Sequence, residues 1–133
     1  MSNEMIARPD SWATGIYCSL NNETDENRKL IYTAMNTKPE RLADHINEPL
    51  AMKDLYIEEI ELPDNNGVMR ACKRIVIITE EGDMYGCVSN GIYNALCRLV
   101  ALFGAPTWEK PINIVVRQRQ GKGTNSYLTI DLV

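Results

Sequence analysis

The sequence of 133 residues is poor in the side chains that build metal and redox sites. It has one histidine, His45, and four cysteines without a Cys-x-x-Cys pair. A zinc site needs several such ligands at short, regular spacing, so we expect no metal and no cofactor. Scattered cysteines are instead typical of free thiols in a reducing compartment.

Long apolar runs are also absent from the sequence. The most apolar stretch, residues 93–103, is interrupted by Arg98 and is far shorter than the roughly 20 residues of a transmembrane helix. Residues 1–10 carry charges and a proline where a secretory signal would be apolar. We therefore expect a cytoplasmic protein.

Basic residues are outnumbered, but their distribution is uneven. The net charge is −4 and aromatic residues make up 7% of the chain. Residues 1–67 hold 6 Lys and Arg against 13 Asp and Glu, a net charge of −7, whereas residues 68–133 hold 8 against 5, a net charge of +3. Because a local basic surface is what neutralises phosphates, the second half is where nucleic-acid binding is expected.

The first third of the chain predicts an extension to a later core. We expect residues 1–14 to be mobile and residues 15–49 to form the extension, whose role the sequence leaves open. Residues 15–20 favour a short strand, and Thr24 precedes a helical pattern with an apolar stripe. Pro39 at a first-turn position predicts a second short helix that ends before Pro49.

Residues 50–133 predict the core of a single domain. Strands are expected at residues 52–62, 69–79, 84–88, 112–120 and 126–133, and a helix capped by Ser89 or Asn90 ends at Gly104. In the first strand the apolar alternation slips at Glu58-Glu59, which predicts a bulge or sharp coil there. The order predicts a mainly β protein, a five-stranded OB-fold barrel with the helix between strands three and four, plus a strand and helix N-terminal extension.

An OB barrel binds single strands over its second and third strands and the flanking loops, with aromatic platforms and cations. Alternation places Arg117 and Arg119 outward on the fourth strand and Tyr127 outward on the fifth. Tyr85 is a stacking platform if Met84 and Gly86 share the inner face. Trp108 either stacks on a base or closes the bottom of the barrel. The complete candidate set for single-stranded DNA is Arg117, Arg119, Lys122, Tyr127, Tyr85, Arg70, Lys73, Arg74, Trp108, Lys53 and Tyr56.

Catalytic patterns are not evident in the sequence, and we expect the protein not to be an enzyme. The run Gly121-Lys122-Gly123-Thr124 lacks the spacing of a phosphate-binding loop and joins two strands rather than a strand and a helix. It predicts a hairpin loop that carries a lysine.

Several short motifs carry a resemblance. The runs Arg74-Ile75-Val76-Ile77-Ile78, Glu81-Gly82-Asp83-Met84-Tyr85, Val88-Ser89-Asn90-Gly91 and Leu102-Phe103-Gly104-Ala105-Pro106-Thr107-Trp108, with Val116-Arg117-Gln118-Arg119, resemble single-stranded DNA-binding proteins. These are encoded by bacteriophages and mobile elements of Gram-positive bacteria, and the likeness spans residues 33–132. It implies a sequence-nonspecific protein that coats and protects single-stranded DNA during replication, with replication proteins as further partners.

Other interpretations stay open at this point. The negative total charge favours an OB-type protein-interaction module, or an inhibitor of a host enzyme that mimics DNA with its acidic face. RNA is an alternative ligand because stacking platforms accept both nucleic acids.

Overall fold

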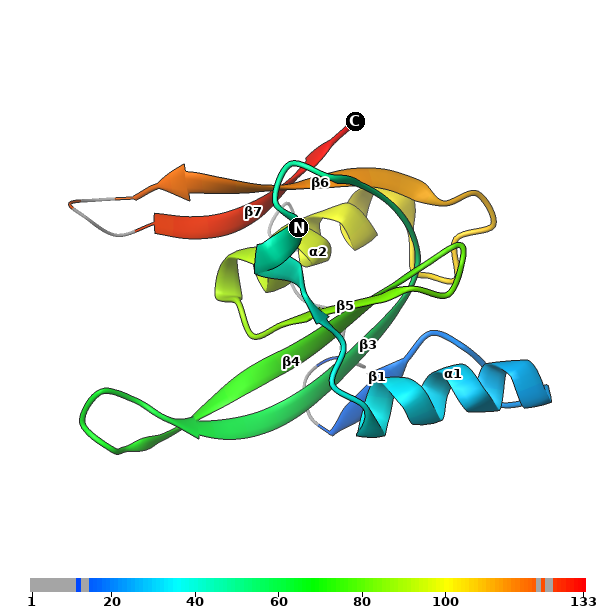
Figure 1. The fold of residues 1–133 in the computed structure, drawn as a ribbon, viewed down its shortest axis with the longest axis horizontal. Helices are drawn as coiled ribbons and strands as arrows, with labels where there is room; N and C mark the ends of the chain where they lie inside the picture. The colour runs from blue at the N-terminus through cyan, green and yellow to red at the C-terminus, as the bar shows by residue number, and fades with distance from the viewer. Residues whose placement is uncertain (1–11, 13–14, 122, 124–125) are drawn as a thin grey trace.

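The computed structural model describes residues 12, 15–121, 123 and 126–133, which form a mainly β protein (Figure 1). In chain order the elements are β1 (Ile16–Cys18), α1 (Asp25–Asn36), β2 (Glu40–Arg41), the 3₁₀ helix η3 (Leu42–His45), β3 (Pro49–Pro63), β4 (Met69–Thr79), β5 (Met84–Cys87), α2 (Asn90–Phe103), β6 (Ile112–Gln120) and β7 (Ser126–Leu132). Within these ranges seven strands form one sheet in the order β2-β5-β4-β3-β6-β7, with β1 beside β3. The sheet curls, so that α2 lies between the β3–β4 and β6–β7 hairpins (Figure 1).

Strand β3 joins the parts of the sheet because it pairs with three other strands. It is antiparallel to β4 over almost its whole length. Its first residues, Pro49 to Met52, also pair with β6, whereas residues 56–58 pair with β1. A strand that changes partners along its length bends from one part of a sheet to another. The register with β4 shifts between Met52 and Asp54, close to where the pairing with β6 ends.

The predicted irregularity at Glu58-Glu59 is wrong. Both residues pair with β4 in unbroken register, opposite Arg74 and Lys73. The apolar phase changes because the second half of β3 leaves the core, not because the strand bulges. Leu62 near its end is 40% exposed.

Apolar side chains gather on both faces of the sheet. The main core lies on the face that packs against α2 and η3, and it includes Leu55, Ile57, Ile75, Ile77, Leu96, Trp108, Ile114 and Val116. On the opposite face, an outer cluster consists of Ala34, Tyr56, Val76 and Ile78. The two clusters alternate along β3 and β4, which explains why these strands are apolar on both sides.

Both helices begin at caps that their sequences indicate, and α2 also ends where predicted. The Thr24 hydroxyl accepts a hydrogen bond from the Asn27 amide at 3.1 Å, and the Ser89 hydroxyl accepts one from the Ile92 amide at 3.2 Å. These are N-caps, which satisfy amides that have no partner within the helix. Helix α2 ends at Gly104, whose φ of 83° suits glycine.

The N-terminal extension is attached to the sheet at several points. Strand β1 pairs with β3, β2 pairs in parallel with β5, and Ala34 of α1 packs in the outer cluster. The second helix predicted after Pro39 is wrong in kind. Its residues form the two-residue strand β2 and the 3₁₀ helix η3, because pairing with β5 overrides the local helical pattern.

The strand count therefore differs from the predicted five, since β1 and β2 join the sheet. The residues predicted for the five barrel strands form β3 to β7, and α2 stands between β5 and β6. In chain order, α2 therefore follows the fifth strand of the sheet rather than the third, and a further helix, α1, lies between β1 and β2. The curled sheet is consistent with an OB-like barrel. The predicted mobility of residues 1–14 lies outside the described residues except at Trp12, which is buried in the main core.

None of the helices in the described part of the chain is long and apolar enough to cross a membrane.

The contact between α2 and β7 gives a first prediction. A Cβ atom on Gly91 would lie 2.0 Å from the Leu128 carbonyl oxygen, which belongs to the backbone and cannot rotate away. We expect Gly91→Ala to lower the free energy of unfolding by about 1–3 kcal/mol, as overpacking does. Chemical denaturation measures the change. Asn94→Ala, at an exposed position of the same helix, is the control and should be nearly neutral; equal stability of the two variants would show that the contact is not tight.

Candidate nucleic-acid interface

Two hairpins project from the same side of the molecule, as Figure 1 shows. One is β3–β4, closed by a turn in which the Asp64 carboxylate accepts hydrogen bonds from the amides of Asn66 and Val68. The other is β6–β7. In OB barrels the loops at these two places in the strand order flank the bound oligonucleotide.

The β6–β7 hairpin has one polar face and one apolar face. Arg119 pairs directly with Tyr127, and Arg117 pairs with Thr129, so all four side chains share a face. The neighbouring residues of the other face pack in or against the main core. The predicted outward positions of Arg117, Arg119 and Tyr127 are confirmed. Their side chains are 43%, 50% and 48% exposed, in that order.

Both arginines of this face share one carboxylate, that of Asp131. One terminal nitrogen of Arg119 lies 2.7 and 2.8 Å from its two oxygens, and Arg117 Nε lies 3.4 Å from one of them. Arg117 also donates a hydrogen bond to the Asn47 side-chain oxygen at 2.6 Å. The group of two arginines and one aspartate keeps a net charge of +1. Ion pairs this exposed contribute little to stability, so a phosphate can compete with Asp131. We call Arg117, Arg119, Tyr127 and Asp131 the arginine face.

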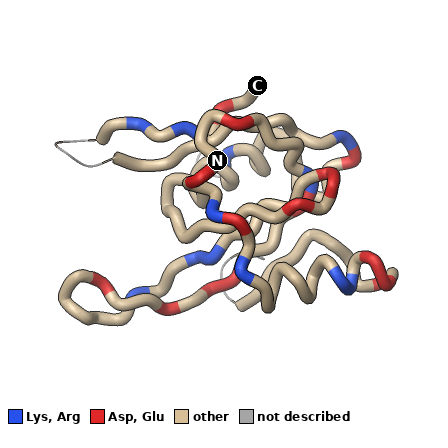
Figure 2. The backbone as a smooth tube through the Cα atoms, viewed as in Figure 1, with Lys and Arg blue, Asp and Glu red and all other residues tan. Residues whose placement is uncertain are grey.

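The β3–β4 hairpin carries cations on both of its faces. Arg70 is exposed near the turn, with its Nε 3.0 Å from Asp64. Lys73 donates to the Trp12 carbonyl and pairs with Glu59 at 3.0 Å. Arg74 lies on the face opposite to Lys73, as predicted, and donates to the carbonyl oxygens of Ala34 in α1 and of Thr37 directly after it. Figure 2 shows the basic positions on both hairpins, with acidic positions interleaved on β3.

The tip of this hairpin also exposes apolar side chains. Leu62, Val68 and Met69 are each at least 40% exposed beside Arg70. The sequence prediction did not include them. The phase change in β3 was the available signal, because it marks where the strand leaves the core.

The remaining candidates lie inside the molecule or support its core. Trp108 is 6% exposed and donates from its indole nitrogen to the Gly104 carbonyl, so it closes the barrel rather than presenting a platform. Lys53 donates to the carbonyls of Trp108 and Glu109 at 3.0 and 3.2 Å. The stacking role predicted for Tyr85 requires its neighbour Met84 to face inward. Instead Tyr85 points toward the main core and Met84 packs against the outer cluster, so this condition is not met. Lys122 lies outside the described residues.

Tyr56 is fully buried in the outer cluster. Its hydroxyl donates to Glu58 at 3.0 Å, and the Arg74 guanidinium lies 5.7 Å from its ring centre. Burial, followed by the hydrogen bond to Glu58, raises the pKa of Tyr56 to about 12.

The described residues keep their possible metal ligands apart. They contain no cluster of His, Cys, Asp or Glu able to hold a metal ion. All four cysteines are free thiols. Burial raises the pKa of the Cys87 thiol to about 12, so its reactive thiolate is scarce at neutral pH.

A curled β sheet with cationic hairpins and an exposed tyrosine has the features with which oligonucleotide-binding modules hold single strands. A family model described as phage single-stranded DNA-binding protein, of the Phi29 type, matches residues 12–133. The chain therefore belongs to this family of phage single-stranded DNA-binding proteins, which agrees with the resemblance seen in the sequence. Searches of curated proteins and of solved structures gave no significant match.

His45 gives a prediction about pH. Its Nδ1 lies 2.9 Å from Glu48 and its Nε2 lies 2.7 Å from Glu40, and these hydrogen bonds, that of Glu48 first, raise the pKa of His45 above its ordinary 6.5. A raised pKa in the folded state stabilises the protein fully below pH 6.5, and this stabilisation is lost as the pH rises through the folded-state pKa.

The chain has a single histidine, so its NMR resonances can be followed without assignment. We expect a titration midpoint above 6.5 that falls in Glu48→Gln and stays unchanged in Glu109→Gln. A midpoint at or below 6.5 in the native protein would contradict the two-carboxylate arrangement.

Proposed function

We propose that the protein binds single-stranded DNA without sequence preference, as an OB-fold barrel and without catalysis, and coats and protects it during phage or mobile-element replication in the host cytoplasm. The arginine face carries the proposal. It combines two guanidinium groups with an exposed aromatic ring on one rigid pair of strands. Membership of the phage family supports the choice of ligand.

The proposed contacts divide between phosphate and base. Arg117 and Arg119 pair with backbone phosphates, which adds affinity that falls with salt concentration. Tyr127, directly across from Arg119, stacks on a base, an interaction of about 1–3 kcal/mol that accepts any base. Arg70 and the apolar tip of the β3–β4 hairpin extend the path. Tyr85, Trp108 and Lys53 take structural roles in this proposal.

Titration with dT and rU oligomers of graded length at two salt concentrations tests the ligand itself. We expect dT binding that weakens with salt, and comparison with rU decides between DNA and RNA. Failure to bind any single strand at low salt would favour the alternative of a protein-interaction or inhibitor module.

Removal of the two arginines should weaken binding and flatten its salt dependence. We expect Arg117→Ala with Arg119→Ala to bind dT about tenfold more weakly at low salt. Each lost phosphate contact should reduce the slope of log affinity against log salt by about 0.7, or about 1.4 for the pair. Arg98→Ala with Lys110→Ala removes the same charge from exposed positions elsewhere. An equal loss in both double variants would mean that net charge, not the arginine face, governs binding.

Neutralising Asp131 should have the opposite effect. In Asp131→Asn the two guanidinium groups lose the carboxylate that competes with phosphate, so we expect about threefold tighter binding of dT at low salt. The matched control is Glu80→Gln, which removes one exposed negative charge at the β4–β5 turn. If both variants gain equally, or neither gains, Asp131 does not compete with the ligand.

A further inference from the structure

Helix α1 lies on a face of the sheet that an OB barrel would use for its ligand. The outer cluster is on the side of β3 and β4 away from the main core, and Met84 of β5 packs against it. Strands β4 and β5 are the second and third strands of the predicted barrel, whose face binds oligonucleotides in OB folds. Ala34 of α1 belongs to this cluster, and Cys18 and Leu20 also pack against it.

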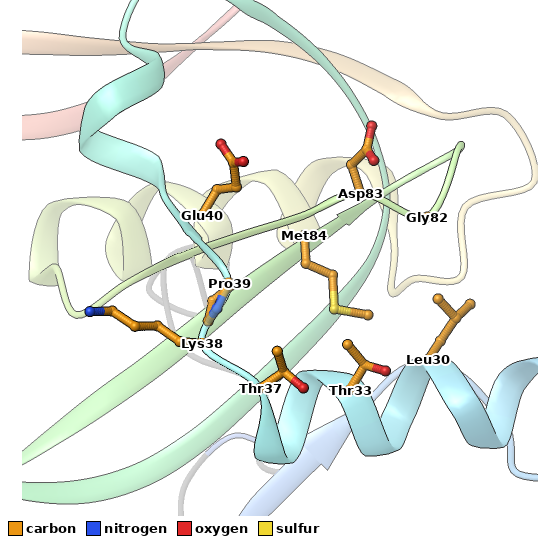
Figure 3. Close-up of a pocket in the computed structure, with 9 residues that line it drawn as sticks. All are labelled: Leu30, Thr33, Thr37, Lys38, Pro39, Glu40, Gly82, Asp83 and Met84. Atoms are coloured by element: carbon orange, nitrogen blue, oxygen red, sulfur yellow. The ribbon is translucent and has the colours of Figure 1, made fainter.

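The helix is held there by few contacts. Ala34 is the one buried residue among the twelve of α1, and Tyr32 and Met35 are 65% and 46% exposed. A hollow of about 300 Å³ separates Leu30 and Thr33 of the helix from Met84 (Figure 3). Two more, of about 390 and 240 Å³, adjoin its C-terminal and N-terminal parts. Because so few of its residues are buried, α1 can leave the sheet at small cost, and away from the sheet a helix of this length is marginal in water.

Beneath the helix lies an aromatic and cation pair of the kind that single-stranded nucleic acids bind. The Arg74 guanidinium sits over the Tyr56 ring and pairs with Glu58 at 3.6 Å. It donates to the carbonyl oxygens of Ala34 at 2.9 Å and Thr37 at 3.3 Å. Carbonyls at the C-terminal end of a helix carry partial negative charge, so they occupy donors that a phosphate would take.

From this arrangement we infer that the outer face of β3, β4 and β5 is a second contact surface for single-stranded nucleic acid, which α1 covers in the free protein. Binding displaces α1, exposes Tyr56 to a base and transfers Arg74 from helix carbonyls to a phosphate. This inference rests on the proposed function, since it extends the path of the same ligand from the arginine face.

Hydrogen exchange of the native chain with and without saturating dT tests the displacement directly. We expect amides of residues 30–36 to exchange faster in the complex, while those of β6 and β7 exchange more slowly. Unchanged or slower exchange in α1, together with protection of β6 and β7, would overturn the inference and leave the proposed function intact. If dT neither binds nor protects any strand, the proposed function fails and the inference fails with it.

A variant that weakens only the cover provides a second test. Thr24→Ala removes the N-cap of α1, and we expect about fivefold tighter dT binding because a larger fraction of molecules is open. Ser89→Ala removes the equivalent cap of α2 and should give no gain. Unchanged or weaker binding in Thr24→Ala would overturn the inference.

The role of Tyr56 is tested in the same background. Adding Tyr56→Leu to Thr24→Ala should cancel the gain, provided that circular dichroism shows a folded protein. A folded double variant that keeps the fivefold gain would remove Tyr56 from the surface.

Discussion

The pairing of β3 with three strands is the constraint on which the rest of the structure depends. Its edge with β4 builds one hairpin, its first residues position β6 and thereby β7, and its middle holds β1. Because successive residues of β3 face opposite sides, Leu55 and Ile57 anchor the main core while Tyr56 lies under α1. One strand thus fixes the separation of the two hairpins and places a helix on the outer face.

Positive charges in the candidate interface are partly neutralised by neighbouring acidic side chains. The described cations on both hairpins have nearby acidic partners: Arg70 with Asp64, Lys73 with Glu59, Arg74 with Glu58, and Arg117 and Arg119 with Asp131. In a chain with a net charge of −4, this keeps the unbound surface from attracting every polyanion. In the proposed function, affinity depends on exchanging carboxylates for phosphates locally, which reconciles an acidic protein with a nucleic-acid ligand.

Most of the strands could be predicted because local signals and tertiary structure agree in them. β4 and β6 have the predicted bounds, and alternation placed Arg117, Arg119 and Tyr127 on the exposed face. The failures come from long-range contacts. Parallel pairing with β5 turned the segment after Pro39 into a strand, and packing of α1 buried Tyr56, which no local pattern encodes. Trp108 could either stack on a base or close the barrel, and local pattern did not choose between them. Its neighbour Lys53, for example, is also distant in sequence.

The central claim is that a single strand lies across the arginine face. Photo-crosslinking of the native protein to a dT oligomer carrying 5-iododeoxyuridine, read by mass spectrometry, tests it most directly. We expect adducts on Tyr127. Tyr32 on α1 is more exposed and serves as an internal reference for accidental contact. Adducts on Tyr32 with none in residues 112–132 would contradict the account.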